Sequence, residues 1–214
     1  MGWIDEAGLI VVVRLENLSH AVDLAEALVE GGVRVLEFTY TNREAGSAIE
    51  RVRRALGDAC HVGAGSVLDA ETARLAMISG AEFIVTPTVR SRTIEICRRY
   101  SVPAVIGAFT ETEILTAWER GADYIKVNPA GMAGPAYFKD VLGPLPQIRL
   151  IPSGGVTLDT GPAFLAAGAA ALAVGGDLVD RHAIAKGDWG AITQRSRAFV
   201  AMVERAREGG PTRP

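Results

Sequence analysis

Short runs of apolar and β-branched residues recur along the whole chain, separated by longer amphipathic stretches. The runs are nearly continuous in apolar character and do not alternate with polar residues, which is typical of strands buried on both faces. We therefore expect parallel strands covered by helices. The eight runs are Leu9–Val13, Val33–Phe38, His61–Gly63, Phe83–Thr86, Ala104–Ile106, Tyr124–Val127, Ile148–Ile151 and Ala171–Val174.

The stretches between these runs carry the spacing and the end signals of helices. Ser19 or His20 opens the first helix, in which apolar residues recur at helical intervals as far as a Gly–Gly stop. Asp69 is expected to cap the N-terminus of a helix that ends at Gly80. The other predicted helices are Ala45–Leu56, Arg90–Tyr100, Glu111–Arg120, Pro135–Leu142, Leu158–Ala167 and Trp189–Glu208.

Strand and helix patterns alternate evenly to the end of the chain, with no linker between them. This regular alternation predicts a single-domain α/β protein, a (β/α)8 TIM barrel spanning residues 1–214, with flexible ends at 1–7 and 208–214. A doubly wound parallel sheet is the structural alternative. The even repeat and the lack of a dinucleotide fingerprint favour the barrel.

Composition narrows the possible function classes. The 214 residues carry a net charge of −3, so the basic excess expected of a nucleic-acid-binding protein is missing. Cys60 and Cys97 do not form a disulfide framework, and the cysteines and histidines show no zinc-binding spacing. There is no apolar run of membrane-spanning length and no signal-peptide pattern at the N-terminus. We therefore expect a cytoplasmic protein with no metal, no cofactor and no membrane partner.

Lys126 interrupts an apolar run, in the segment GADYIKVNPA. Burial disfavours the charged ammonium form, and the neutral amine is a nucleophile. A buried lysine held in a salt bridge, or one reaching the barrel rim, is the alternative interpretation. The chain has only three lysines, at 126, 139 and 186, and this one stands at a strand end. These facts favour a catalytic role.

Glu37 interrupts a second apolar run in the same way, in GVRVLEFTY. A carboxyl group in such surroundings suits proton transfer near neutral pH. The alternative is a structural ion pair with Arg14 or Lys126. Because a pair with Lys126 would also hold the amine in place, the two interpretations are compatible.

Other candidates for substrate binding stand at the carboxyl ends of the predicted strands, where barrels carry their active sites. Arg14 ends LIVVVR and can grip a carboxylate or phosphate with two hydrogen bonds, although pairing with Glu16 or Glu37 is equally compatible with the spacing. Thr39, Ser66 and Pro87 follow the second, third and fourth runs. Ser66 is expected to donate a hydrogen bond to a substrate carboxylate.

Glycine pairs follow the last two predicted strands: Ser153, Gly154 and Gly155 after the seventh, and Gly175 and Gly176 after the eighth. In barrels these two loops form a recurrent phosphate site, because glycines let backbone N–H groups converge on an anion. The alternative is that these glycines only end the strands and turn the chain, without binding a ligand. Asp177 is unusual beside an anion site, and could instead cap a helix.

These segments together resemble the 2-keto-3-deoxy-6-phosphogluconate / 4-hydroxy-2-oxoglutarate (KDPG/KHG) aldolase family, which are class I aldolases with a TIM barrel. The matching segments are GGVRVLEFT, HVGAGSVLD, FIVTP, ADYIKVNPA, IPSGGV and LAVGGDLV, in order and over about residues 8–205. The resemblance implies that Lys126 forms a Schiff base with a 2-keto acid, that Glu37 is the general acid/base, and that the products are pyruvate and an aldehyde. It also implies a homotrimer acting in carbohydrate metabolism.

The chain departs from the phosphogluconate branch of that family in places. Thr41 stands where that branch has an arginine that contacts the pyruvyl carboxylate, and Asn128 replaces a phenylalanine. Arg14, the segment GPAYFK and Asp177 resemble the phosphogalactonate branch. The resemblance therefore implies that Arg14 and Ser66 hold the substrate carboxylate.

Two other functions share parts of this pattern. A phosphosugar isomerase or epimerase would use the glycine pairs with an acid/base pair, but would not need Lys126 as a nucleophile. A non-catalytic barrel could bind a sugar phosphate without any covalent step. The aldolase remains the leading hypothesis because it alone explains Lys126.

Overall fold

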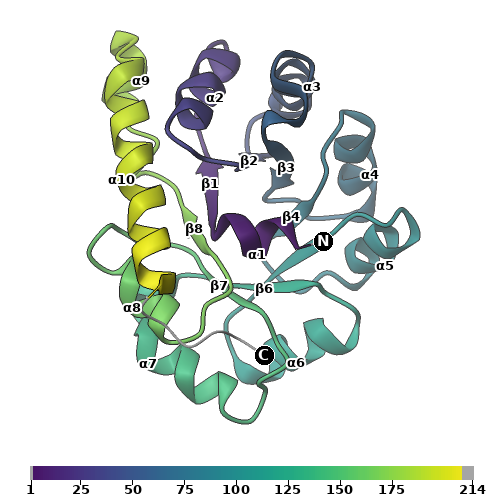
Figure 1. Ribbon diagram of the computed structural model, residues 1–214. Helices are drawn as coiled ribbons and strands as arrows, with labels where there is room; N and C mark the ends of the chain where they lie inside the picture. Colours follow the sequence, from purple (N-terminus) through teal and green to yellow (C-terminus); the bar gives the residue numbers. More distant parts are fainter. Residues whose placement is uncertain (1, 209–214) are drawn as a thin grey trace.

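The computed structural model describes residues 2–208 and shows eight parallel strands surrounded by helices (Figure 1). The predicted barrel is confirmed, and the doubly wound sheet is excluded. Each predicted strand is present, with ends displaced by at most two residues. The strands are β1 (Leu9–Val13), β2 (Val35–Thr39), β3 (His61–Gly65), β4 (Ile84–Thr86), β5 (Ala104–Ala108), β6 (Tyr124–Val127), β7 (Leu150–Pro152) and β8 (Leu172–Val174).

The strands pair in chain order from β1 to β7, and β8 pairs with the other side of β1. Contacts between β7 and β8 close the ring. Ser153 bridges Ala173 in parallel register, and the Ala170 N–H donates to the Leu150 carbonyl at 2.8 Å. The carboxyl ends of all eight strands therefore meet at one end of the barrel within the described chain.

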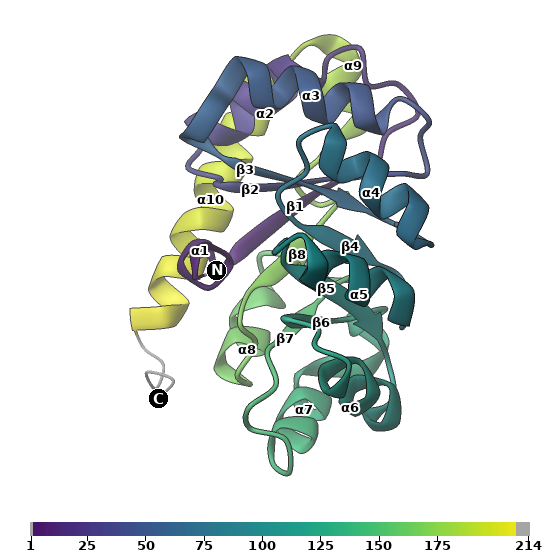
Figure 2. The same cartoon turned by 90° about the vertical axis from the view of Figure 1, so that its right-hand side faces the viewer.

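The helices, apart from a short one at the amino end of the chain, lie around the outside of the ring of strands (Figures 1 and 2). They are α1 (Trp3–Ala7), α2 (Ala21–Glu30), α3 (Ala45–Leu56), α4 (Ala70–Ile78), α5 (Ser91–Arg99), α6 (Glu111–Glu119), α7 (Ala130–Leu142), α8 (Gly161–Ala166), α9 (Arg181–Lys186) and α10 (Trp189–Glu208), with a 3-10 turn at Gly57–Ala59. Asp69 caps α4 as predicted, accepting the Thr72 N–H at 2.7 Å. No helix of residues 2–208 has the length and apolar character needed to cross a membrane.

One helix begins earlier than its sequence pattern predicts. The prediction placed this helix at Pro135–Leu142, but α7 already begins at Ala130. Gly134, with φ of 72° and ψ of 167°, separates the two halves, and Pro135 starts the second. Because glycine readily adopts positive φ and proline favours a helix start, the pattern revealed only the second half.

Alternation along the strands divides the core into two parts. Val35 of β2 and Tyr124 of β6 belong to a small cluster inside the barrel, together with Ile4 of α1. The residues one position further along, Leu36 and Ile125, belong to the large cluster under the helices. Since successive side chains of a strand point to opposite faces, residues 37 and 126 must point inward again.

The amino-terminal segment was expected to be flexible over residues 1–7, and this expectation is wrong for residues 3–7. They form α1, which lies across the middle of the ring of helices in Figure 1. Ile4 is fully buried, and the Trp3 ring stacks on His61 with centroids 4.0 Å apart. The Asp5 carboxylate accepts a hydrogen bond from Tyr124. These contacts lie at the amino ends of β3 and β6, so α1 closes the barrel opposite the strands' carboxyl ends.

Both cysteines are buried and free, as expected of small apolar side chains. Desolvation raises the pKa of Cys60 to about 11 and that of Cys97 to about 12, so both remain uncharged thiols at neutral pH. At the carboxy-terminal end, residue 208 is the last of α10, and the rest of the expected flexible end, residues 209–214, lies outside the described residues.

Removing the Ile4 side chain tests the role of α1. Ile4→Ala should destabilise the protein by about 2–5 kcal/mol, because it leaves a cavity in the barrel interior. Met132→Ala is the control, since Met132 is 81% exposed and should change stability by less than about 0.5 kcal/mol. Chemical denaturation measures both. Equal stability of the two variants would contradict the buried position of α1.

Candidate active site

Lys126 of β6 and Glu37 of β2 meet inside the barrel. The Lys126 Nζ lies 2.8 Å from Glu37 Oε2 and 3.2 Å from Oε1, and donates to both oxygens. Both residues are buried, at 8% and 1% exposure. A buried charge needs a close partner of opposite charge, and the Lys126 amine and the Glu37 carboxylate are such partners for each other.

Glycines at inward-facing positions make room for this pair. Gly107 is the register partner of Lys126, and Gly63 is the register partner of Glu37. A Cβ at Gly65 would overlap the Glu37 carboxylate, and a Cβ at Gly107 would overlap the backbone of Pro87. A side chain at Gly65 would therefore displace the Glu37 carboxylate from the position in which it meets Lys126.

A small cavity of about 60 Å³ opens onto the pair. Besides Lys126 and Glu37, its lining includes four of the predicted substrate-binding residues, namely Arg14, Ser66, Pro87 and Ser153. Ser66 has φ of 55°, a conformation that L-residues rarely adopt and that marks many functional sites. The predicted amine, carboxyl group and carboxylate-binding residues therefore surround one space.

A second cavity, of about 360 Å³, adjoins the first. The two share Val12, Arg14, Asn128 and Ser153 in their linings. The larger one is also lined by the predicted glycine pairs and their neighbour, Gly154, Gly155, Gly175, Gly176 and Asp177. The predicted anion-binding loops thus lie beside the buried pair.

Thr39 is the predicted site residue that the structure does not bring into either cavity. Its hydroxyl donates to the Val13 carbonyl at 3.4 Å and lies 2.9 Å from the Thr41 hydroxyl. Thr39 is buried at the end of β2, where it ties that strand to β1. The hydroxyl of Thr39 therefore contacts β1 and Thr41.

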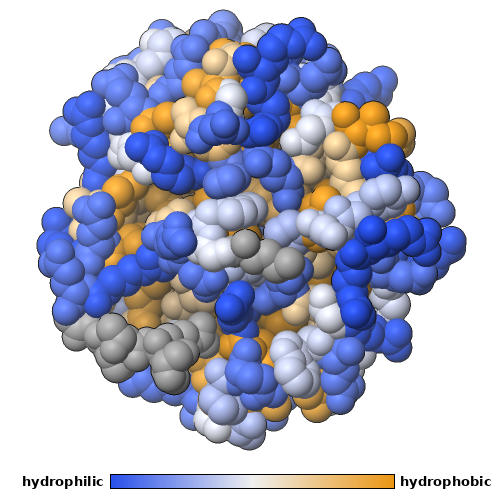
Figure 3. All heavy atoms as spheres, turned by 45° about the vertical axis from the view of Figure 1, so that its right-hand side comes forward, coloured by the Kyte–Doolittle hydropathy of each residue, from blue (hydrophilic) through white to orange (hydrophobic). Residues whose placement is uncertain are grey.

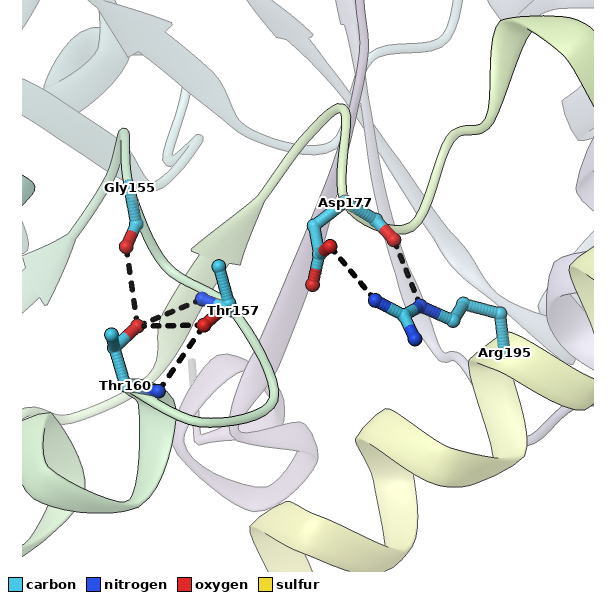
Figure 4. A network of polar contacts seen from close by, with 5 residues as sticks. All are labelled: Gly155, Thr157, Thr160, Asp177 and Arg195. Atoms are coloured by element: carbon cyan, nitrogen blue, oxygen red, sulfur yellow. Dashed lines mark hydrogen bonds and ion pairs between the residues drawn. The ribbon is translucent and has the colours of Figure 1, made fainter.

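Asp177 does not cap a helix, which was one of the two roles considered for it. Asp180 caps α9, accepting the backbone N–H groups of His182 at 2.7 Å and Ala183 at 3.3 Å, and these donors lower the pKa of its carboxyl group. The Asp177 carboxylate instead pairs with Arg195 of α10 at 2.8 Å (Figure 4). The negative charge of Asp177, beside the second glycine pair, is thus paired with the positive charge of Arg195.

Arg14 makes neither of the ion pairs considered for it. Glu37 is taken by Lys126, and no carboxylate within the described part of the chain lies in ion-pair contact with Arg14. The Arg14 side chain is exposed and lines both cavities. Its guanidinium is therefore available to an anion.

Sequence reasoning missed several residues of the site. Asn128 lines both cavities, and Arg181 lines the larger one. Gly107 carried a usable signal, because a lone glycine inside a strand indicates close approach of another group. Arg181 gave none, since it belongs to the short helix α9, which the apolar pattern did not reveal.

Two of the histidines contact carboxylates outside the site. His20 lies 2.9 Å from Asp23, and His61 lies 3.1 Å from Glu82. Among residues 2–208 no three His, Cys, Asp or Glu side chains are grouped so that they could hold a metal ion.

Curated relatives and solved structures resemble the chain over most of its length. The 2-dehydro-3-deoxy-phosphogluconate aldolase of Treponema pallidum is 34% identical over 202 residues, which cover 94% of this chain and 95% of the relative. A solved structure named native KDPGal is 29% identical with a TM-score of 0.87, covering 94% of this chain and 96% of the other. The KDPG aldolase of Legionella pneumophila, solved with pyruvate captured as a covalent carbinolamine intermediate, is 27% identical with a TM-score of 0.86, covering 92% and 96%.

A model of the KDPG and KHG aldolase family matches residues 2–195, nearly the whole barrel. This match agrees with the whole-length relatives and with a buried lysine–glutamate pair at the carboxyl end of the strands. The chain therefore belongs to the KDPG and KHG aldolase family, and it is a carbon–carbon lyase.

Proposed function

We propose that Lys126 forms the Schiff base and that Glu37 moves the protons in a class I aldolase reaction. The reaction cleaves a 2-keto acid with a hydroxyl group at C4 into pyruvate and an aldehyde. The observation that carries this proposal is the 2.8 Å contact between the two side chains inside a barrel. This function rests on the pair and on membership of the aldolase family.

The contact distance suits the first step. One proton passed from the Lys126 ammonium to the Glu37 carboxylate leaves a neutral amine and a carboxylic acid. The amine attacks the C2 carbonyl of the substrate and gives a carbinolamine. The carboxylic acid then protonates the departing hydroxyl group, so that water leaves and an iminium ion forms.

The iminium ion accepts the electrons of the bond that breaks. Glu37, again a carboxylate, removes the proton of the C4 hydroxyl group, either directly or through a water molecule. The C3–C4 bond breaks and the aldehyde leaves. The electrons of the broken bond stay on C3 and form the enamine of pyruvate. The enamine takes a proton at C3, and water releases pyruvate and restores the Lys126 amine.

Each cavity suits one part of the substrate. The smaller has room only for a compact group such as the pyruvyl unit, with Arg14 and Ser66 as donors to its carboxylate. The larger suits the distal part, whose anionic group would meet backbone N–H groups of the two glycine loops. The substrate class is therefore a 2-keto-3-deoxy sugar acid with a distal anion.

The alternative functions explain less of the geometry. A phosphosugar isomerase or epimerase needs the acid/base group and the glycine loops, but has no use for a buried amine in contact with the base. A non-catalytic barrel explains neither member of the pair. Membership of the aldolase family favours the lyase over both.

We propose further that the chain acts as a homotrimer in the cytoplasm. Large apolar side chains are exposed on and before α4, at Leu68, Leu75 and Ile78. Figure 3, on the side that carries α4 and α5, shows apolar patches within a mostly hydrophilic face. Such patches support packing between chains. The two free thiols support a reducing compartment.

Trapping with borohydride tests the role of Lys126. Pyruvate plus sodium borohydride should attach a reduced pyruvyl group to the peptide containing Lys126, read by peptide mass spectrometry. Lys126→Ala should lose both the adduct and turnover, whereas Lys186→Ala, which removes an exposed lysine, should keep both. An adduct on Lys139 or Lys186, or none at all, would reject the Schiff base at Lys126.

Replacing the carboxyl group tests the proton transfers. Glu37→Gln should lower kcat by about 10²–10⁴-fold, because the amide cannot exchange protons with the reacting groups. Some borohydride adduct should persist, since the amine remains. Glu50→Gln, which changes an exposed carboxylate of α3, should leave kcat unchanged. Wild-type turnover in Glu37→Gln would refute the acid/base assignment.

Adding one methyl group tests the space around the pair. Gly65→Ala should lower kcat by at least about 10²-fold, because the new Cβ would displace the Glu37 carboxylate from Lys126. Gly190→Ala is the matched control, because a Cβ at Gly190 would lie 3.8 Å from its nearest neighbour beyond the helix backbone, which is ordinary van der Waals contact. Circular dichroism confirms folding of both variants. Full activity of Gly65→Ala would show that the carboxylate need not occupy this position.

A further inference from the structure

Asp177 places a negative charge in the cavity that would receive the distal anion of the substrate. It lines that cavity together with both glycine pairs. Two like charges a few ångströms apart repel each other, and the repulsion is stronger where solvent is partly excluded. An uncompensated Asp177 would therefore oppose the binding of an anionic substrate tail.

Arg195 of α10 contacts Asp177 twice, and one of the contacts compensates this charge (Figure 4). One guanidinium nitrogen lies 2.8 Å from Asp177 Oδ1, and Nε donates to the Asp177 backbone carbonyl at 3.0 Å. The second carboxylate oxygen, Oδ2, is buried without a hydrogen-bond partner. Within residues 2–208, Arg195 is thus the one cation paired with Asp177.

The same two contacts fix the loop itself. The Leu178 N–H donates to the Gly175 carbonyl at 3.0 Å, and Arg195 holds the carbonyl of Asp177 in the same turn. The Arg195 side chain also packs on a residue of its own helix, since its guanidinium carbon lies 5.6 Å from the centre of the Phe199 ring. The loop that carries the second glycine pair is therefore tied to α10.

The other charges at this cavity are positive. Arg14 and Arg181 line it, and neither forms an ion pair with a carboxylate in the described part of the chain. Once Arg195 has neutralised Asp177, the lining carries a surplus of positive charge. That surplus favours a phosphate or carboxylate.

We propose that Arg195 is a positioning residue that makes this cavity selective for a substrate with an anionic distal group. It acts through Asp177, by cancelling the carboxylate charge and by fixing the loop after β8. This inference rests on the proposed function, because it takes the larger cavity as the place of the distal substrate group. Without Arg195, the carboxylate repels the anion that the glycine loops bind.

Aldol addition with two matched aldehydes tests the inference. Pyruvate is kept saturating, and kcat and KM are measured for glyceraldehyde 3-phosphate and for glyceraldehyde, which lacks the phosphate. Arg195→Gln should lower kcat/KM for the phosphorylated aldehyde by about tenfold, mainly through KM. It should change kcat/KM for glyceraldehyde by less than about twofold.

Two further variants separate charge from structure. Arg195→Lys keeps the cation, so it should retain most of the preference for the phosphorylated aldehyde. The double variant Arg195→Gln with Asp177→Asn removes both charges and should recover the kcat/KM that Arg195→Gln loses. The half-exposed pair contributes little to stability, so all variants should fold.

Three results would overturn the inference. The first is an equal loss for both aldehydes in Arg195→Gln, which indicates a merely structural role. The second is a failure of Asp177→Asn to restore activity in that background. The third is a wild-type enzyme that does not prefer the phosphorylated aldehyde.

A separate measurement shows which proposal has failed. Exchange of the pyruvate methyl hydrogens with deuterated water needs only the chemistry proposed for Lys126 and Glu37. Exchange in the wild type and in all Arg195 variants, with no discrimination between the aldehydes, leaves the aldolase intact and rejects the role of Arg195. No exchange in the wild type rejects the Schiff-base function itself.

Discussion

The ion pair between Lys126 and Glu37 is the constraint around which the barrel interior is arranged. Two charges taken out of water carry a large desolvation cost, which only a close contact offsets. The contact at 2.8 Å requires that both side chains point inward and that the opposing positions stay empty. The glycines beside the pair satisfy the second requirement. The packing of the barrel and the chemistry of the site therefore depend on the same few positions.

The inward-facing positions change in character along the barrel axis. Towards the amino ends of the strands they are apolar or aromatic, and α1 closes that end with Ile4. Two residues further along the same strands they become polar. The successive pairs are Val35 and Glu37, Tyr124 and Lys126, and Ile151 and Ser153. The closed end holds the structure together, and the open end is free to bind and react.

The sequence made the barrel and its central pair predictable for a physical reason. A charged residue inside a short buried strand must face either the core or a site, so Glu37 and Lys126 stood out within single segments. The glycine pairs were predictable from the strands they follow. Helix α1 was not, because its few residues are ordered by contacts with strands far along the chain. Two contacts were also not predictable, because each depends on how separate elements pack. They are the ion pair between Asp177 and Arg195 and the hydrogen bond from the Thr39 hydroxyl to β1.

A crystal structure of the protein soaked with pyruvate tests the central claim most directly. We expect continuous electron density from Lys126 Nζ to C2 of pyruvate, with the Glu37 carboxylate within about 3.2 Å of the new linkage. Pyruvate bound without a bond to Lys126, or bound covalently at another residue, would contradict the account.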